Sequence, residues 1–250
     1  MITLTTDFGD SEYAGAVRGV ILSLNPSAQV VDITHSIPAF NIRRAAYALY
    51  TVFSYFPKGT VHVVVVDPGV GTERKGLILE SEGHFFVGPD NGVFSLVDAE
   101  RVYEISVKNA SSTFHGRDVF APIAAQIDIG RSPEKFGSEI EAYEKVLKKD
   151  VEVSERITGE VYCTDTFGNI ITSIKKEHLE VYGLNLGGAF SVRFGERVFK
   201  MQFVQTYGDA DVGEIVGLVN SAGHFEVSLR EGRAAERLEI QGGESVEVSV

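Results

Sequence analysis

Acidic side chains stand at or near the ends of strand-like runs in the first part of the chain. Asp7 and Asp67 each close such a run, and Asp32 lies within another one. In open α/β sheets, ligands bind beyond the carboxyl ends of the strands, so these carboxylates are candidates for ligand binding. The alternatives are an N-cap for Asp7 and a plain turn for Asp67-Pro68-Gly69, because Pro fixes φ and Gly permits positive φ.

Arg74 and His115 supply the other groups that a water-activating site needs. A carboxylate, a guanidinium and an imidazole can together bind and orient one water molecule. The Arg keeps the carboxylate ionised, and the His exchanges a proton near neutral pH. Arg74 ends the segment DPGVGTER that begins at Asp67, and His115 lies in STFHGRD before an expected helix. The alternative for His115 is a loop side chain packed against Phe114, and the spacing alone does not bring the three groups together.

The glycines near Asp67 suggest a phosphate-binding loop at first sight. However, no glycine stands at position 74 to complete the pattern G-x-G-x-x-G that would start at Gly69. No Lys-Ser or Lys-Thr pair follows at P-loop spacing either. The sequence therefore argues against a dinucleotide or triphosphate site.

The cysteine and histidine content argues against a bound metal. Cys163 is the only cysteine in the sequence, so an intrachain disulfide is impossible. Its apolar neighbours are typical of a small, buried side chain. The 6 histidines are scattered, and no Cys or His pair has the spacing of zinc ligands. We therefore expect no metal and no cofactor.

Two polar segments in the second half are candidates for recognition. Asn169 ends DTFGN, and its amide can present a donor and an acceptor to an adenine edge. An Asn at the start of a strand is more commonly a turn residue. The segment NSAGHFE, residues 220–226, fits either a hairpin turn or the wall of a polar pocket.

Composition narrows the class of protein further. The 250 residues are 44% hydrophobic and carry a formal net charge of −12. Nucleic acid would be repelled, and no basic cluster with interleaved aromatics offsets that charge. No stretch approaches the roughly 18 apolar residues of a membrane span, and the chain opens without a signal-peptide pattern. We therefore expect no membrane association and a cytoplasmic location.

The order of elements predicts two domains. Up to about residue 145, strand-like and helix-like runs alternate, with expected helices at 13–24, 42–56 and 119–129. This alternation favours an α/β domain with a largely parallel sheet, which we assign to residues 1–147. Short strands separated by turn residues follow. They favour a small all-β, barrel-like domain over residues 148–250.

Seven segments together resemble one family. In chain order they are TTDFGD, DITHSIPAFNI, VVVVDPGVGTER, GPDNGVFS, STFHGRDVFAP, DTFGNIITSI and NSAGHFEVS. The same order occurs in the S-adenosyl-L-methionine hydroxide adenosyltransferases, the hydrolase relatives of the fluorinase and chlorinase. The similarity runs from residue 1 to about residue 240. It implies hydrolysis of S-adenosyl-L-methionine to adenosine and L-methionine, by attack of an activated water at the ribose C5′. It also implies a homotrimer with its sites between subunits.

The resemblance assigns roles to residues of both domains. Asp67, Arg74 and His115 match the water-activating set. The matched substrate contacts are Asp7 and Asp67 at the ribose, Phe40 and Phe114 as apolar walls, Phe167 and Asn169 at the adenine, Ser221 and Glu226 at the methionine part, and the backbone of Leu229 beside the adenine.

Two positions depart from the family pattern. Arg230 stands where family members often have Asn, which affects the adenine contacts near Leu229. Ala222 stands where the halogenating enzymes have Arg, which argues against their grip on the methionine carboxylate. The rival functions are a halide-dependent adenosyl transferase, of the chlorinase or fluorinase type, and a nucleoside-binding protein with little turnover.

Overall fold

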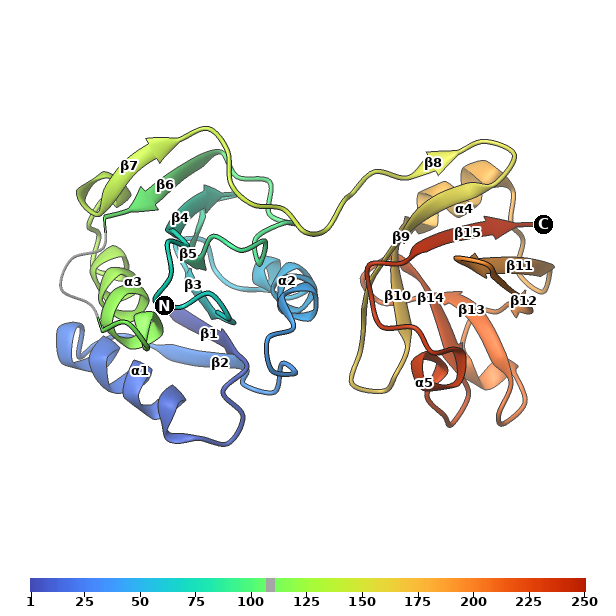
Figure 1. Cartoon of the computed structure of the whole chain (residues 1–250), viewed down its shortest axis with the longest axis horizontal. Helices are drawn as coiled ribbons and strands as arrows, with labels where there is room; N and C mark the ends of the chain where they lie inside the picture. The colour runs from blue at the N-terminus through green and yellow to red at the C-terminus, as the bar shows by residue number, and fades with distance from the viewer. Residues whose placement is uncertain (107–110) are drawn as a thin grey trace. The chain divides into compact units, whose positions relative to one another are not determined.

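The computed structural model describes residues 1–106 and 111–250. The chain consists of two compact units, Met1–Val146 and Leu147–Val250, and each has its own hydrophobic core (Figure 1). Across the described residues, we find no helix whose length and apolar character would let it span a membrane.

The first unit is built on a seven-stranded sheet. Its strands lie in the order β2-β1-β3-β5-β4-β6-β7. The first four are parallel to one another, and β4, β6 and β7 add antiparallel pairings. The bounds are β1 (Ile2–Thr6), β2 (Val30–Thr34), β3 (Val61–Val65), β4 (Gly76–Ser81), β5 (His84–Pro89), β6 (Arg101–Ile105) and β7 (Gly137–Ile140).

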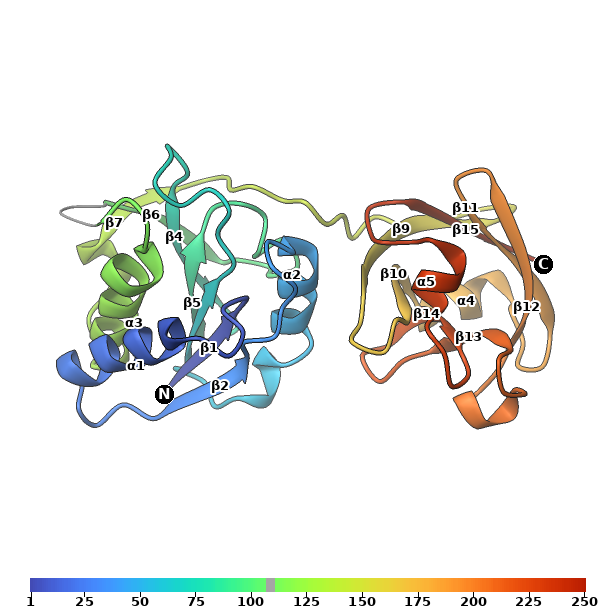
Figure 2. The same ribbon diagram turned by 60° about the horizontal axis from the view of Figure 1, so that its bottom comes forward.

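Helices cover both faces of this sheet, as the valine run of β3 requires. Val63 and Val65 face the core shared with α1 (Glu12–Leu24) and α3 (Ala121–Asp128). Val64 and Val66 face the core shared with α2 (Ile42–Tyr50). Figure 2 shows α1 and α3 together on one side of the strands and α2 on the other. A strand buried on both faces reads as a continuous apolar run.

The second unit is a closed barrel. Seven strands pair in the order β10-β14-β13-β12-β11-β15-β9, and the pairing of β9 with β10 closes the ring. The bounds are β8 (Glu152–Val153), β9 (Ile157–Thr164), β10 (Ile170–Lys175), β11 (Ala189–Phe194), β12 (Arg197–Phe203), β13 (Ile215–Val219), β14 (His224–Leu229) and β15 (Ser245–Ser249), with helices α4 (Lys176–Tyr182) and α5 (Ala234–Leu238). The predicted fold class, an α/β unit followed by a β-barrel-like unit, is confirmed.

Two helix boundaries differ from the prediction. The helix expected over 42–56 ends at Tyr50, because the β-branched and aromatic residues that follow have low helix propensity. Pro57 then holds Phe56 in extended backbone, with φ −87° and ψ 154°. The helix expected from residue 119 is preceded by a π-helical turn, η2 (Gly116–Phe120), which runs directly into α3.

Candidate functional site

Two of the candidate carboxylates lie at the same edge of the first unit's sheet. β1 and β3 are parallel neighbours, and Thr6 pairs with Val65 near their carboxyl ends. Asp7 directly follows β1, and Asp67 follows β3 after one further residue. The central parallel strands therefore place both carboxylates where ligands bind in open α/β sheets.

Asp67, Arg74 and His115 form one contiguous cluster. Arg74 donates from Nε to Asp67 Oδ1 over 3.0 Å and makes a second contact from its terminal nitrogen to Oδ2. The same terminal nitrogen lies 3.0 Å from His115 Nδ1. The Arg74 and Asp67 side chains are only 7% and 5% exposed. The chain thus brings together three groups that are 7 and 41 residues apart in sequence.

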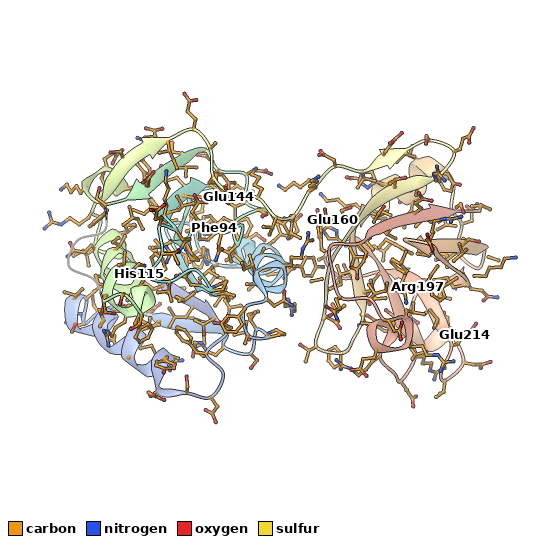
Figure 3. All side chains as sticks on the ribbon, in the orientation of Figure 1. Phe94, His115, Glu144, Glu160, Arg197 and Glu214 are labelled. Carbon is orange, nitrogen blue, oxygen red and sulfur yellow. The ribbon has the colours of Figure 1, made fainter. Side chains whose placement is uncertain are left out.

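Close backbone packing joins the two loops that carry this cluster. Gly71 has φ +78°, and a Cβ there would lie 2.1 Å from the carbonyl oxygen of Ser112. A Cβ at Gly116 would lie 2.8 Å from Val65 Cγ1, so the π-helical turn after His115 sits directly on β3. Figure 3 labels His115 in the first unit, next to α3. The two glycines allow the Asp67 loop, the His115 loop and β3 to meet.

Burial and charge act against each other in the cluster. Burial raises the pKa of the Asp67 carboxyl, while the Arg74 guanidinium and the nearby His115 oppose the rise. Burial, followed by the positive charge of Arg74, lowers the pKa of His115, and Asp67 opposes that change. Because a guanidinium stays charged, Asp67 is an ion-paired carboxylate and His115 a neutral imidazole near neutral pH.

The contacts also fix which His115 nitrogen carries the proton. A guanidinium can only donate, so Nδ1 of His115 accepts the hydrogen bond from Arg74. In the neutral ring the proton then resides on Nε2, which is left to donate to a further group. An open cavity of about 420 Å³ borders the cluster, lined in part by Gly71, Arg74, Lys75, Glu104, Ser112 and His115.

Asp7 and the aromatic candidates form the neighbouring part of this edge. Asp7 Oδ2 accepts a hydrogen bond from the backbone nitrogen of Phe40 over 2.8 Å. Phe40 has φ 66° and a 69% exposed side chain, so Asp7 stabilises a turn that presents an aromatic ring to solvent. Phe114 packs edge-on against Phe8 and Tyr13, with ring centroids 5.7 and 5.3 Å apart.

Asp32 lies in a second, more exposed cluster of the same residue types. Arg18 of α1 contacts both Asp32 and His35, and its Nε lies 3.2 Å from Asp32 Oδ1. His35 Nδ1 lies 2.8 Å from the hydroxyl of Thr6. The Arg18 and Asp32 side chains are 37% and 34% exposed. This cluster fastens α1 to the edge strand β2.

The second unit holds the remaining candidates. Asn169 is 7% exposed and donates from its amide to Asp165 Oδ2 over 2.9 Å. Phe167, at the tip of the same turn, is 75% exposed. The turn that carries Asn169 leads directly into β10, and Ile171 of β10 pairs with Glu226 of the adjacent strand β14.

Glu226 is a buried carboxylate held by neutral donors. It is 2% exposed and accepts hydrogen bonds from Tyr207 and Ser228, both over 2.7 Å, and from Asn220 over 3.2 Å. Burial, followed by the hydrogen bond to Glu226, raises the pKa of the Tyr207 hydroxyl. Tyr207 was not among the residues predicted from the sequence, because it lies in a short 3-10 turn outside the seven segments that resemble the family.

Ser221 and Leu229 flank this carboxylate at the two ends of β14. Ser221 is exposed in the turn before the strand. Leu229 is the last residue of the strand and packs against the barrel core. The candidate residues thus fall into two sets, one in each unit. In the described part of the chain, His, Cys, Asp and Glu side chains form no group of three or more that could hold a metal ion.

Comparisons with known proteins cover both units. Sequence models of the SAM hydroxide adenosyltransferase N-terminal and C-terminal domains match residues 2–137 and 159–247. A curated relative from Methanocaldococcus jannaschii, named (R)-S-adenosyl-L-methionine hydrolase, is 37% identical, with 99% of this chain and 95% of the relative covered. A protein named fluorinase from Actinopolyspora mzabensis is 26% identical, with 100% of this chain and 97% of that protein covered.

A solved structure is also similar to this chain in sequence and fold. The crystal structure of an uncharacterized conserved protein from Thermotoga maritima matches with a TM-score of 0.89 at 38% identity, and 100% of each chain is covered. The matched domains lie on the two structural units described above. This chain belongs to the SAM hydroxide adenosyltransferase family.

Proposed function

We propose that this chain is an S-adenosyl-L-methionine hydrolase that forms adenosine and L-methionine by attack of water at the ribose C5′. The observation that carries the proposal is the buried Asp67–Arg74–His115 cluster at the carboxyl edge of the parallel strands. Relatives named (R)-S-adenosyl-L-methionine hydrolase support it, because they are 32% to 37% identical whereas the relatives named fluorinase are 24% to 26% identical.

The reaction suits this set of groups. A neutral thioether leaves a cationic sulfonium, so departure needs no strong acid. The site must instead hold a water oxygen in line behind C5′, and such positioning can lower a barrier by roughly 7–11 kcal/mol in favourable cases. Asp67 accepts a hydrogen bond from that water, Arg74 keeps Asp67 ionised, and neutral His115 polarises the same oxygen. The attacking water loses one proton to this cluster.

The remaining candidates bind the substrate. Asp7 holds the ribose hydroxyls, with Phe40 and Phe114 as apolar walls. In the second unit, Phe167, Asn169 and the backbone of Leu229 hold the adenine, and Ser221 and Glu226 hold the methionine part. Asp67→Ala or His115→Ala should therefore remove most turnover, whereas Asn169→Ala should mainly weaken binding. Turnover lost at saturating substrate in Asn169→Ala, with binding intact, would contradict this division.

We further propose that the protein acts as a homotrimer with shared sites, in the cytoplasm and without a metal or other cofactor. The candidate residues belong to both units, which fits a site completed by a neighbouring subunit. Light scattering combined with an activity assay across a dilution series tests the assembly, and an active monomer would exclude the shared site. Full activity after dialysis against a chelator is expected.

Incubation with S-adenosyl-L-methionine in ¹⁸O water, followed by chromatography and mass analysis, tests the activity itself. Adenosine labelled at the 5′-hydroxyl supports direct attack by water. The assay is repeated in sodium chloride and in sodium fluoride, because an ionised Asp67 should repel halide and still bind water. Halogenated deoxyadenosine would identify a halide-dependent transferase. An unchanged ligand would identify a nucleoside-binding protein.

A further inference from the structure

We infer that Asp165 orients the Asn169 amide, and that this orientation makes the pocket select a 6-amino purine over a 6-keto purine. The inference rests on the proposed function, because it takes the purine ring of the substrate to lie against Asn169. Asp165 Oδ2 accepts a hydrogen bond from the Asn169 amide nitrogen over 2.9 Å. Asp165 Oδ1 accepts from the backbone nitrogens of Phe167 and Asn169, both over 2.9 Å.

The carboxylate leaves the amide only one stable orientation. A carboxylate accepts hydrogen bonds and cannot donate them, so the nitrogen of the Asn169 side chain must face Asp165. Turning the amide over would place its oxygen against the carboxylate and lose the hydrogen bond. Among the described residues, no donor contacts Asn169 Oδ1. That oxygen, and the second hydrogen of the amide nitrogen, are therefore available to a ligand.

The turn that carries both residues is held firmly. Asp165 donates its backbone N–H to the Asn169 carbonyl over 3.0 Å, and Ala235 of α5 donates to the Gly168 carbonyl over 2.8 Å. Gly168 has φ +82°, and a Cβ there would lie 2.7 Å from Arg233 Cβ. Arg233 also donates to the Thr166 carbonyl over 2.9 Å. The α5 end of the barrel therefore keeps the turn from shifting to suit a different ligand.

The fixed amide distinguishes two purines by their 6-substituents. Adenine offers an amino donor at position 6 beside an acceptor at N1, which match the oxygen and the remaining N–H of Asn169. Hypoxanthine reverses both groups, with a keto acceptor at position 6 and a donor at N1, so it would match only an amide that is turned over. A bidentate pair of this kind discriminates by about 1–3 kcal/mol, which corresponds to about fivefold to 150-fold in affinity.

The test compares adenosine with inosine as ligands. Calorimetric titration of the full chain should show a preference for adenosine of about fivefold to 150-fold. Asp165→Asn should reduce that preference to about threefold or less, because the new amide can donate as well as accept and lets Asn169 turn either way. A second variant, Asp165→Ser, keeps a side-chain oxygen that can accept a backbone N–H in the turn, and should lose the preference similarly.

Glu244→Gln is the matched control. Glu244 also holds a turn of the barrel unit, accepting from the backbone nitrogens of Gln241 and Gly242 over 3.0 and 2.7 Å. This variant should keep the wild-type preference, which separates the orientation of Asn169 from a general loss of turn stability. An unchanged preference in both Asp165 variants would overturn the inference, and so would an equal loss in Glu244→Gln. Wild-type protein that binds both nucleosides equally would overturn it too.

The outcome is independent of the hydrolase assay. Wild-type protein that prefers adenosine but releases none from S-adenosyl-L-methionine would refute the proposed function and leave the role of Asp165 standing. Conversely, if the protein hydrolyses S-adenosyl-L-methionine but does not distinguish the two nucleosides, the proposed function stands and the inference about Asp165 is refuted. The informative readout is the ratio of the affinities for adenosine and inosine. If Asp165 had only a structural role, its substitution would weaken the binding of both nucleosides alike.

Discussion

Two clusters of Asp, Arg and His lie among the described residues of the first unit, and burial separates the cluster that we propose as catalytic from the structural one. Asp67 and Arg74 are 5% and 7% exposed, whereas Asp32 and Arg18 are 34% and 37% exposed. Charges that are removed from solvent interact more strongly and are screened less by salt. The two clusters contain the same residue types, so burial is the property that distinguishes them.

The histidines of the two clusters differ in what they leave available. His35 has both ring nitrogens engaged, with Thr6 at Nδ1 and Arg18 at Nε2. His115 has Nδ1 engaged by Arg74, and no residue in the described part of the chain forms a hydrogen bond with its Nε2. In the exposed cluster both ring nitrogens of His35 are engaged within the protein, whereas in the buried cluster His115 retains one ring nitrogen for a ligand. We expect chemistry only at the buried Asp67–Arg74–His115 cluster.

The largest expected effect is on turnover. Asp67→Asn should lower kcat by about 10²–10⁴-fold, because the water loses its charged acceptor. The corresponding change in the exposed cluster, Asp32→Asn, should leave kcat within about threefold of wild type, since Asp32 contacts no reacting group in our assignment. Steady-state assays of both variants provide the comparison. A similar loss in both would show that the exposed cluster also takes part in the reaction.

Stability should also separate the clusters. Arg74→Met leaves Asp67 as a buried carboxylate without its partner, which typically costs roughly 3–5 kcal/mol. Arg18→Met should cost about 1 kcal/mol or less, because exposed ion pairs contribute little. The unfolding transition of the first unit in urea gives the free energy of unfolding of each variant. Equal costs would mean that burial does not control the strength of these pairs.

The pH dependence of turnover sharpens the comparison. The pKa of His115 is lowered, so the neutral ring persists below the ordinary histidine value of 6.5. As pH falls, kcat/KM should therefore start to decline only below about 6.5, when His115 and Asp67 gain protons as a coupled pair. His35→Gln should retain this acid limb, and His115→Gln should change it. A limb that moves only in His35→Gln would contradict our assignment.

The smallest expected effect is the salt response. The coupling between Arg18 and Asp32, measured by a double-mutant cycle, should be about 0.2–1 kcal/mol and should diminish from low to 1 M salt. The coupling between Arg74 and Asp67 should change much less, because solvent ions do not reach a buried pair. A buried coupling as salt-sensitive as the exposed one would show that solvent enters the Asp67 site.

The sequence predicted the elements well where one physical signal dominates. The β-branched run of β3 identified a strand buried on both faces, and Asp67 at its end followed from that. The turn-rich second half likewise predicted the barrel. Residue types and family resemblance together identified Asp67, Arg74 and His115, but their contact depends on the packing of two loops that no pattern encodes.

Other contacts among the candidate residues depend on the folded packing and were not predictable from the sequence. Tyr207 meets Glu226 only because the segment after β12 brings a short turn over β14, and no periodicity marks that turn. The pairing of Asp165 with Asn169 lies within a quoted segment, yet its orientation follows from hydrogen bonding in the folded turn. The second Asp, Arg and His cluster requires α1 to pack on β2, which residue spacing does not reveal.

The close approach of Gly71 and Ser112 controls the geometry of the Asp67–Arg74–His115 cluster. A side chain can relieve crowding by changing rotamer, but two backbones in contact can only move apart together with everything attached to them. A methyl group at position 71 would lie 2.1 Å from a carbonyl oxygen, so the loop carrying His115 would have to retreat. The backbone contact between Gly71 and Ser112 therefore limits how the two loops can move. Adding a Cβ at position 71 should change the distance between the Asp67 carboxylate and the His115 imidazole.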